Sequence, residues 1–339
     1  MEKFIIRSRM LRIRLMSSVF MSKSTWLFLA TLMTFSFNSR ADTILLVHDK
    51  GEAFSDVKNG FIDEIDGEFT IESLEVTKST SSDAISKSTK KINPKLIVLA
   101  GNTAVKFYAD YQKSQGSDNI PASLVVAALF ADKLVGNLKN ATAIRYEIPA
   151  VTSMVNLRSI SSGSMQKIGV IYREWMKDLI KKNKDFLAQE GFQLVTVSLD
   201  NKTSKPEKDI KKAIKNLKKE KIDALWIIND NTLLNGNTLK KAWIPGLKNT
   251  KFSVVVNAET LISTKFKFGN FAVYPDHYGL GIQVANAVFD IADSDWSIDD
   301  RDIEEPLSVK KALNVKLTEK KGIELKSTAL STVDKVVKK

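Results

Sequence analysis

Polar side chains close several apolar runs of the sequence, and two of these runs end in the same way. Residues 96–103 read LIVLAGNT and residues 225–232 read LWIINDNT, so that an Asn–Thr pair ends each run, about 129 residues apart. Such a pair either caps the helix that follows or faces a binding cleft. The repetition favours the cleft, because capping does not require the same solution twice.

Two charged residues stand at positions where they could select a ligand. Arg173 and Trp175 follow the apolar run KIGVIY, and Asp230 follows LWIIN. A guanidinium forms bidentate hydrogen bonds with a carboxylate or phosphate, and an indole provides a flat apolar wall. A carboxylate at Asp230 would recognise an ammonium group or sugar hydroxyls. The alternatives are a surface pair of Arg173 with Glu174, Trp175 packed on the next helix, and a helix cap at Asp230.

The other candidates also lie at predicted strand ends or at a predicted crossover. Asn229 and Asn257 offer amides that both donate and accept hydrogen bonds. Phe130 would be a stacking wall or would close the core, and Asp276 would reach the ligand or fix a turn. The predicted ligand-binding residues are His48, Asn102, Thr103, Phe130, Tyr172, Arg173, Trp175, Asn229, Asp230, Asn257 and Asp276.

The sequence has none of the motifs on which common catalytic and metal sites depend. There is no phosphate-binding G-x-x-x-x-G-K-S/T pattern and no G-x-S-x-G, and the glycines of YGLGIQ do not form the dinucleotide fingerprint. The chain has no Cys and only two His, His48 and His277, without metal-ligand spacing. We therefore expect no enzyme activity, no cofactor and no metal.

The elements that must position these residues form two similar series. Residues 43–129 and 167–257 each hold four apolar runs separated by helix-like stretches. Continuously apolar strands that alternate with helices indicate parallel sheets covered on both faces. The predicted fold class is therefore α/β, with two doubly wound parallel-sheet lobes. The carboxyl ends of the strands in such sheets form the crevice in which ligands bind.

The alternation changes after residue 257. Residues 271–292 predict a short strand, a polar turn and an amphipathic helix, and residues 306–325 hold two strand-like pieces. Such segments suit connections that return across a hinge between two lobes. The last residues, 326–339, predict a surface helix or a frayed end.

The first 41 residues resemble a secretory signal peptide. They hold seven basic residues, one acid and the apolar run TWLFLATLMTFSF, which is too short to span a bilayer comfortably. Ser39, Arg40 and Ala41 form a small-x-small cleavage pattern, so we expect cleavage near Ala41 and export to the periplasm. Translation could begin at Met1 or at Met21. The alternative is an uncleaved membrane anchor.

The remaining residues are only mildly basic. Half of the formal charge of +12 lies in the first 41 residues, and residues 42–339 keep +6. Most of the lysines lie in helix-like stretches such as KDIKKAIKNLKKEK, which is typical of solvated helix faces. Nucleic-acid binding favours Arg interleaved with aromatic residues, whereas only four Arg follow residue 41. We expect no nucleic-acid partner.

Nearly the whole chain after residue 41 resembles the periplasmic substrate-binding proteins of ABC transporters, in the branch with a type I two-lobe fold. The similar stretches are NPKLIVLAGNTAV, IPASLVVAALFADK, residues 138–172, KIDALWIINDNTLL and FAVYPDHYGLGIQVANAV. The sequence departs from that family at REWMK after KIGVIY, where a small polar turn is usual, and at HDKGEAF. These departures imply a ligand that differs from the amino acids and other small metabolites that such proteins commonly bind.

The resemblance implies a division of the chain and a function. Residues 42–145 with about 274–305 would form lobe 1, residues 146–273 with about 306–325 would form lobe 2, and 326–339 would be a tail. The protein would be a monomer that closes on a small molecule and delivers it to the permease of an ABC transporter. The alternatives are a ligand-binding component of a membrane sensor kinase, an exported α/β enzyme, and lobes that serve a partner protein.

Overall fold

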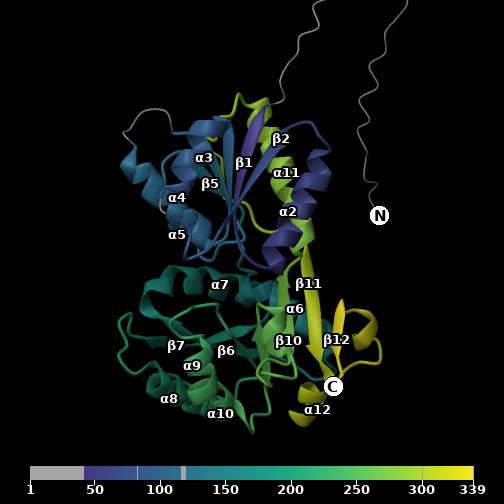
Figure 1. The fold of residues 1–339 in the computed structure, drawn as a ribbon. Helices are drawn as coiled ribbons and strands as arrows, with labels where there is room; N and C mark the ends of the chain where they lie inside the picture. Colours follow the sequence, from purple (N-terminus) through teal and green to yellow (C-terminus); the bar gives the residue numbers. More distant parts are fainter. Residues whose placement is uncertain (1–41, 82, 116–119, 300, 339) are drawn as a thin grey trace, which may run out of the picture. The chain divides into compact units, whose positions relative to one another are not determined.

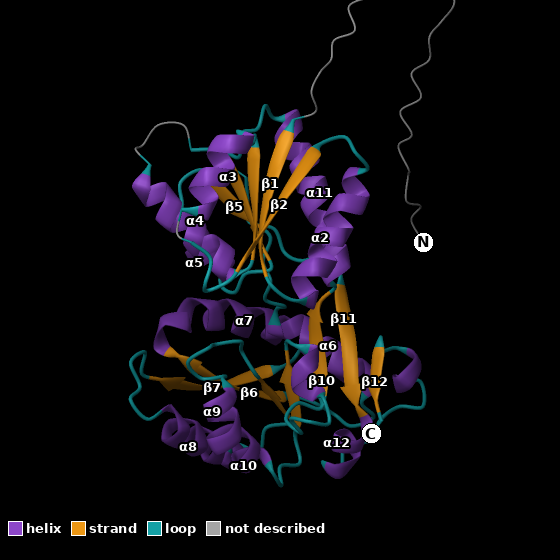
Figure 2. Ribbon diagram, viewed as in Figure 1, coloured by secondary structure: helices purple, strands orange, loops and turns teal. Residues whose placement is uncertain are grey.

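Two parallel sheets organise the chain in the computed structural model (Figures 1 and 2). The structure describes residues 42–81, 83–115, 120–299 and 301–338. The predicted signal peptide therefore lies outside the described residues. Among the residues described, no helix has both the length and the apolar character that a membrane crossing demands.

The first sheet, sheet 1, has five parallel strands in the order β2-β1-β3-β4-β5. Its strands and helices alternate along the chain, as the apolar runs predict. They are β1 (Thr43–Asp49), α2 (Glu52–Ile65), β2 (Thr70–Val76), α3 (Ala84–Ile92), β3 (Leu96–Ala100), α4 (Asn102–Ser114), β4 (Ala122–Val126), α5 (Ala131–Val135) and β5 (Ala141–Ala143).

The second sheet, sheet 2, has seven strands in the order β12-β11-β10-β9-β8-β6-β7. All neighbours run parallel except β10 and β11, which are antiparallel. The elements of its first part are α6 (Ala150–Ile160), β6 (Lys167–Arg173), α7 (Lys177–Gln189), β7 (Gln193–Leu199), α8 (Pro206–Lys219), β8 (Ala224–Trp226), α9 (Gly236–Thr238), α10 (Ile244–Leu247) and β9 (Ser253–Val256). The predicted α/β class with two doubly wound sheets is confirmed.

The chain passes between the sheets three times. It leaves sheet 1 after β5, and it returns after β10 (Phe271–Pro275) as helix α11 (His277–Asp293), which packs against α2. It then enters sheet 2 again as β11 (Val309–Asn314). Gly281 of α11 allows the close contact with α2, because a Cβ atom there would lie 2.2 Å from the Val57 carbonyl oxygen.

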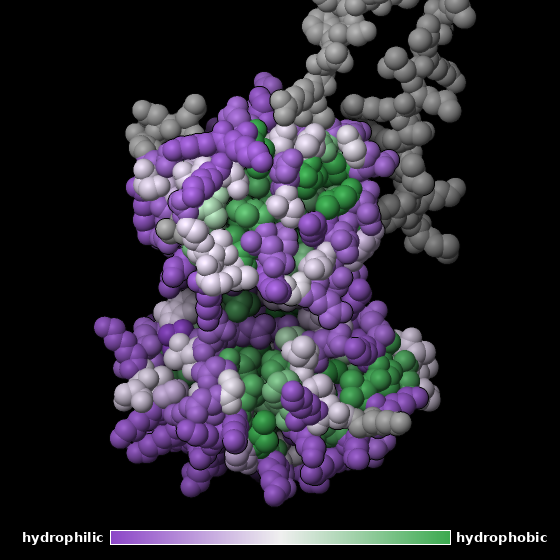
Figure 3. All heavy atoms as spheres, viewed as in Figure 1, coloured by the Kyte–Doolittle hydropathy of each residue, from purple (hydrophilic) through white to green (hydrophobic). Residues whose placement is uncertain are grey.

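Alternate side chains of each strand enter cores on opposite faces of the sheets. In sheet 1, Leu46 and Val98 pack under α2 and α11, whereas Leu45 and Leu99 pack under α3, α4 and α5. In sheet 2, one core lies under α8 and α10 and the other under α6 and α7. Hydrophilic residues cover much of the viewed face of the described chain (Figure 3). The continuously apolar strands are therefore buried on both sides.

The structure corrects two predictions for the C-terminal part. The second strand-like piece of residues 306–325 is helix α12 (Val315–Lys320), which begins where the Asn314 side chain accepts a hydrogen bond from the Leu317 N–H. The described part of the tail has one short 3-10 helix, Ala329–Ser331, and is otherwise neither a surface helix nor a frayed end. Its strand β12 (Lys335–Val337) pairs in parallel with β11 and extends sheet 2.

Candidate functional site

The two Asn–Thr pairs do not occupy equivalent places. Asn102 and Thr103 begin α4 directly after β3. Asn231 and Thr232 instead lie in a turn five and six residues beyond the end of β8. The shared wording therefore comes from two different local structures, although both pairs follow the third strand of their series.

Asn102 holds the loop that follows β4. Its side-chain amide donates to the Leu129 carbonyl at 3.1 Å, and its side-chain oxygen accepts from the Leu129 N–H at 2.9 Å. This loop contains two non-glycine residues with positive φ, Ala127 at 49° and Phe130 at 61°. A backbone in this region is strained for residues other than glycine. The two hydrogen bonds of Asn102 stabilise it next to Phe130.

The amino end of α4 is occupied by a carboxylate of the chain itself. Asp49, at the end of β1, accepts hydrogen bonds from the Thr103 N–H at 3.1 Å and from the Ala104 N–H at 2.8 Å. Gly101 makes this approach possible, since its φ is 107° and a Cβ atom would lie 2.5 Å from the Asp49 carboxyl carbon. The backbone N–H of Thr103 is thus already satisfied.

His48 is buried within sheet 1. Its Nδ1 contacts the Asp49 carbonyl oxygen at 3.0 Å, and its Nε2 contacts the Ser73 hydroxyl at 3.1 Å. Both ring nitrogens therefore have partners in β1 and β2. Among the described residues, no group of three or more potential metal ligands occurs.

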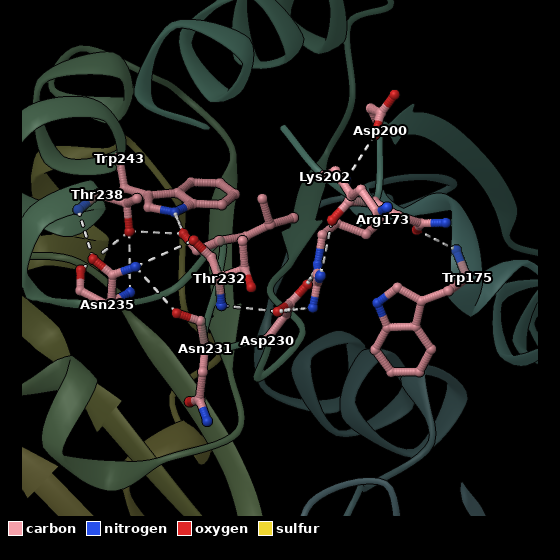
Figure 4. Close-up of polar contacts among 12 residues, drawn as sticks. Arg173, Trp175, Asp200, Lys202, Asp230, Asn231, Thr232, Asn235, Thr238 and Trp243 are labelled. Carbon is pink, nitrogen blue, oxygen red and sulfur yellow. Dashed lines mark hydrogen bonds and ion pairs between the residues drawn. The ribbon is translucent and has the colours of Figure 1, made fainter. Parts of the chain in front are cut away.

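Arg173 and Asp230 bind each other (Figure 4). Arg173 donates from Nε to one Asp230 oxygen at 2.6 Å and from Nη2 to the other at 2.8 Å. The Asp230 side chain is only 3% exposed and that of Arg173 is 18% exposed. Asp230 also accepts from the Thr232 N–H at 2.9 Å. The pair links the ends of β6 and β8, and a direct ligand contact by either residue stays a prediction.

Trp175 and Phe130 bring the two sheets together. Their rings lie 4.8 Å apart, nearly perpendicular, although Phe130 follows β4 of sheet 1 and Trp175 follows β6 of sheet 2. The backbone N–H of Trp175 donates to the Asn201 side-chain oxygen at 2.8 Å. The Lys133 ammonium lies 4.4 Å from the centre of the Trp175 indole. Edge-to-face pairs of this kind are a favourable arrangement of aromatic rings.

A cavity of about 320 Å³ lies beside this aromatic pair. We call it the central cavity. Its wall includes Phe130, Glu147, Trp175, Phe186, Trp226 and Asn257. Drug-sized ligands occupy pockets from about 300 Å³ upward, so the cavity has room for a small organic molecule.

Two residues that line the central cavity each hold a buried polar atom without a hydrogen-bond partner among the described residues. These atoms are the indole Nε1 of Trp226 and the side-chain oxygen Oδ1 of Asn257. These residues are 2% and 3% exposed. A buried polar group without a partner costs about 1–3 kcal/mol, so native proteins rarely keep one without a reason. One is a donor and the other an acceptor, at the ends of neighbouring strands β8 and β9.

Glu147 supplies an acidic group to the same wall. It lies between β5 and α6, and one of its oxygens accepts a hydrogen bond from the Phe130 N–H at 2.6 Å. Burial raises the pKa of its carboxyl group to about 7, against the opposing effect of the Phe130 N–H. The Asp132 charge also raises this pKa, and the Arg145 charge lowers it.

The central cavity brings together only some of the residues predicted from sequence. Phe130, Trp175 and Asn257 line it. Tyr172 is half-buried against the core of sheet 2, and Asn229 is half-buried directly before Asp230. The predicted residues that do not line it are His48, Asn102, Thr103, Tyr172, Arg173, Asn229, Asp230 and Asp276.

Asp276 lies where the chain leaves sheet 2 for α11. Its carboxylate is 2.8 Å from the Lys310 ammonium, and its N–H donates to the Ser308 carbonyl at 3.0 Å. Burial is the largest single effect and opposes ionisation, but the hydrogen bond and charge of Lys310, together with the backbone N–H groups of Gly279 and Tyr278, hold the pKa of Asp276 below its usual range. These contacts join two crossings of the chain.

Trp226 and Glu147 were not predicted from sequence. Trp226 could have been noticed in the sequence, because it is an indole inside a run otherwise made of aliphatic residues. A buried indole N–H normally needs an acceptor. Glu147 lies in a connection without strand or helix periodicity, where its burial has no sequence signal.

A larger cavity, of about 590 Å³, lies at the opposite ends of the strands of sheet 2. Its wall includes Lys218, Lys221 and Lys251 together with Asp223 and Glu324. None of the buried polar atoms that lack a partner in the described chain belongs to its wall. The central cavity is therefore the stronger candidate for a ligand site.

Comparison with known proteins supports this reading of the fold. A sequence search finds no matching family profile and no matching curated protein. A substrate-binding protein with adhesive properties from Clostridium difficile, in its ligand-free open form, matches 88% of this chain and 100% of its own at 14% identity, with a TM-score of 0.64. The chain has the fold of the type I periplasmic binding proteins.

Two further similar structures are those of proteins that bind a small molecule. An ABC domain in complex with L-Trp from Streptococcus pneumonia is 15% identical over 87% of this chain and 100% of its own, with a TM-score of 0.56. An arabinose-binding protein from Geobacillus stearothermophilus is 10% identical over 80% and 96%, with a TM-score of 0.52. At these identities the type I fold is what the chains share.

Proposed function

We propose that the protein captures a small organic solute in the central cavity outside the cytoplasm and delivers it to the permease of an ABC transporter. The observation that carries this proposal is that two residues of the cavity wall, Trp226 and Asn257, each hold a buried polar atom without a partner in the described chain, Nε1 and Oδ1 respectively. A solute with one hydrogen-bond acceptor and one donor would satisfy both atoms.

The aromatic part of the wall indicates a solute with a flat apolar portion. Phe130, Trp175 and Phe186 surround the cavity together with the Trp226 indole. Aromatic walls with a few polar groups are typical of small-molecule sites. Proteins of this fold include one in complex with L-Trp and one that binds arabinose, so the aromatic wall and not the fold carries this choice of solute.

The division into lobes belongs to this proposal. Residues 42–145 with about 274–305 would form the lobe of sheet 1, and residues 146–273 with about 306–325 would form that of sheet 2. Binding proteins of this kind close by hinge motion of two domains around the ligand. The crossings near Asp276 and Lys310 would then form part of the hinge, and export through the predicted signal peptide would place the protein in the periplasm.

The experiment is a thermal-unfolding screen of the purified protein. The panel contains L-Trp, indole, adenine, arabinose and short peptides at about 1 mM each. A solute present at 100 times its dissociation constant stabilises the protein by about 2.7 kcal/mol, which raises the unfolding temperature by several degrees. We expect this rise for a planar solute and not for arabinose.

Two variants locate the effect. Trp175→Ala removes an aromatic wall of the cavity and should abolish the rise. Tyr278→Ala removes an exposed aromatic residue outside the cavity and should preserve it. If no compound raises the unfolding temperature, or if Trp175→Ala responds like the unmodified protein, the proposed binding function is wrong. Uptake of the identified solute by cells that lack the protein then tests delivery to a permease.

A further inference from the structure

Some charged groups at the central cavity form ion pairs with one another, and one carboxylate does not. Arg145 donates to both oxygens of Asp132, at 2.8 and 2.5 Å, and to Glu305 at 2.8 Å. Lys182 lies 3.9 Å from Glu305 as well. These four groups neutralise one another, so a charged solute gains little from any of them.

Glu147 differs from the other charged groups of the wall. No ion pair to Glu147 occurs within the described residues, and its contact there is the Phe130 N–H. The carboxyl group therefore has acceptor capacity left, since an ionised carboxylate accepts about four hydrogen bonds. A carboxylate that is half-buried and lacks a cation loses part of its hydration without compensation. A cationic solute would remove this cost.

The aromatic rings next to Glu147 suit the same type of solute. Aromatic faces attract cations, and the Lys133 ammonium already lies over the Trp175 ring at 4.4 Å. Lys133 is an exposed side chain that can move into solvent, so a solute ammonium can replace it.

From this arrangement we infer that the solute is an aromatic amine, whose protonated amino group pairs with Glu147 while its ring packs against Phe130 and Trp175. This inference rests on the proposed function and narrows it from a planar solute to a planar cation. The Asn257 oxygen would accept a hydrogen bond from a ring N–H, and an acceptor atom on the solute would satisfy the Trp226 N–H.

Four probes with one ring system but different charges test the inference. They are tryptamine, a cation; indole, which is neutral; indole-3-acetate, an anion; and L-Trp, a zwitterion. Isothermal titration of the purified protein at pH 8 measures each dissociation constant. We expect tryptamine to bind about tenfold to a hundredfold more tightly than indole, the range that a hydrogen bond to a charged group supplies. Indole-3-acetate should bind more weakly than indole.

Glu147→Gln is the decisive variant, because its side-chain oxygen can still accept from the Phe130 N–H while the charge is lost. Tryptamine should lose its advantage over indole in this variant. Asp185→Asn is the matched control, since it removes one exposed negative charge from α7 outside the cavity wall. It should leave both constants unchanged.

A pH series adds a second readout. A primary amine stays protonated between pH 6 and 8, as a lysine does. The pKa of about 7 at Glu147 then predicts that tryptamine binds more tightly at pH 8 than at pH 6, and that Glu147→Gln loses this dependence. The other charged groups that face the cavity are Asp132, Lys133, Arg145, Asp178, Lys182 and Glu305, and they are common to both proteins.

The outcomes separate this inference from the proposed function. If indole or indole-3-acetate binds at least as tightly as tryptamine, the solute is not a cation, although the cavity remains a binding site. If tryptamine binds equally to Glu147→Gln, the carboxylate is not its partner and the inference is overturned. If none of the probes binds while another panel compound does, the aromatic-amine class is wrong and the proposed function stands.

Discussion

The Arg173 guanidinium and the Asp230 carboxylate form a bidentate ion pair, with both hydrogen bonds at 2.8 Å or less. The carboxylate is almost completely buried, whereas the guanidinium still reaches solvent. The pair joins the ends of β6 and β8, from which Trp175 and Trp226 enter the wall of the central cavity. It therefore fixes the relative positions of two cavity residues.

Removing only the cation from this pair should destabilise the fold. Arg173→Met leaves the buried carboxylate without its cation, and breaking buried pairs costs about 3–5 kcal/mol. We expect about 3 kcal/mol here, because Arg173 is partly exposed. The double variant Arg173→Met, Asp230→Leu should regain most of this loss, since apolar pairs often replace buried ion pairs without cost. Urea denaturation measures both. A double variant less stable than Arg173→Met would contradict this account.

Asn102 should control binding through the loop that it holds. Asn102→Ala removes two hydrogen bonds to the Leu129 backbone, worth about 1–2 kcal/mol together at an exposed site. The strained backbone at Phe130 can then relax, which moves the ring away from Trp175. We expect weaker binding of the best solute by about tenfold, measured by titration calorimetry.

The control for this prediction is Asn137→Ala. Asn137 is also exposed and donates one side-chain hydrogen bond, to the Lys133 carbonyl at 2.7 Å. Its loss should change stability slightly and affinity very little. Equal affinities of the Asn102→Ala and Asn137→Ala variants would show that Asn102 does not position Phe130.

Much of the fold was predictable because buried parallel strands have a strong sequence pattern. TILLVH, KLIVLA and KIGVIY are continuously apolar, which is the signature of strands covered on both faces. The prediction for the tail was wrong because STVDKVVKK is mostly polar, and strand β12 forms only through its pairing with β11. Such pairing is a tertiary effect that short-range patterns do not contain.

The site was less predictable than the fold. Position at a strand end identified Phe130, Trp175 and Asn257, which do line the cavity. The same rule selected Arg173 and Asp230 as separate ligand contacts, and the structure pairs them because the ends of β6 and β8 are neighbours. Strand order is a property of the folded sheet, so the sequence alone could not show that these opposite charges meet.

The buried ammonium group of Lys321 should lower the free energy of unfolding at neutral pH. Its ammonium is buried, 5% exposed, and donates to the Thr250 hydroxyl at 2.7 Å. Burial lowers the pKa of Lys321 to about 8, with further repulsion from Lys218 and Lys320. The unfolded chain holds this proton up to about pH 10.5, so the free energy of unfolding should rise as the pH rises from about 8 to 10.5.

Lys321→Met should therefore be more stable than the unmodified protein below pH 8, by about 2–3 kcal/mol. The difference should shrink as the pH approaches 10.5. Denaturation at pH 7, 9 and 10.5 checks the trend, and Lys316→Met is the control, because Lys316 is an exposed lysine of α12 that does not affect the pKa of Lys321. A constant difference across this range would mean that Lys321 keeps an ordinary pKa.

Glu147 should give the ligand-free protein an opposite pH dependence. Its pKa is raised by burial from 4.5 to about 7, so the folded state holds a proton that the unfolded chain has already released. The free energy of unfolding should fall by about 1–3 kcal/mol as the pH rises from about 4.5 to 7. Glu147→Gln should lack this contribution. If the free energy of unfolding changed equally in the two proteins between pH 4.5 and pH 8, the raised pKa would not belong to Glu147.

The central claim is that a solute occupies the central cavity, which Phe130, Trp175 and Trp226 line. The most direct measurement is fluorine NMR of the protein labelled with 5-fluorotryptophan, with each signal assigned by a Trp→Phe variant. The solute that most raises the unfolding temperature should shift the signals of Trp175 and Trp226 and leave those of Trp243 and Trp296, which lie outside the cavity wall, in place. Unchanged Trp175 and Trp226 signals with a saturating solute would contradict the account.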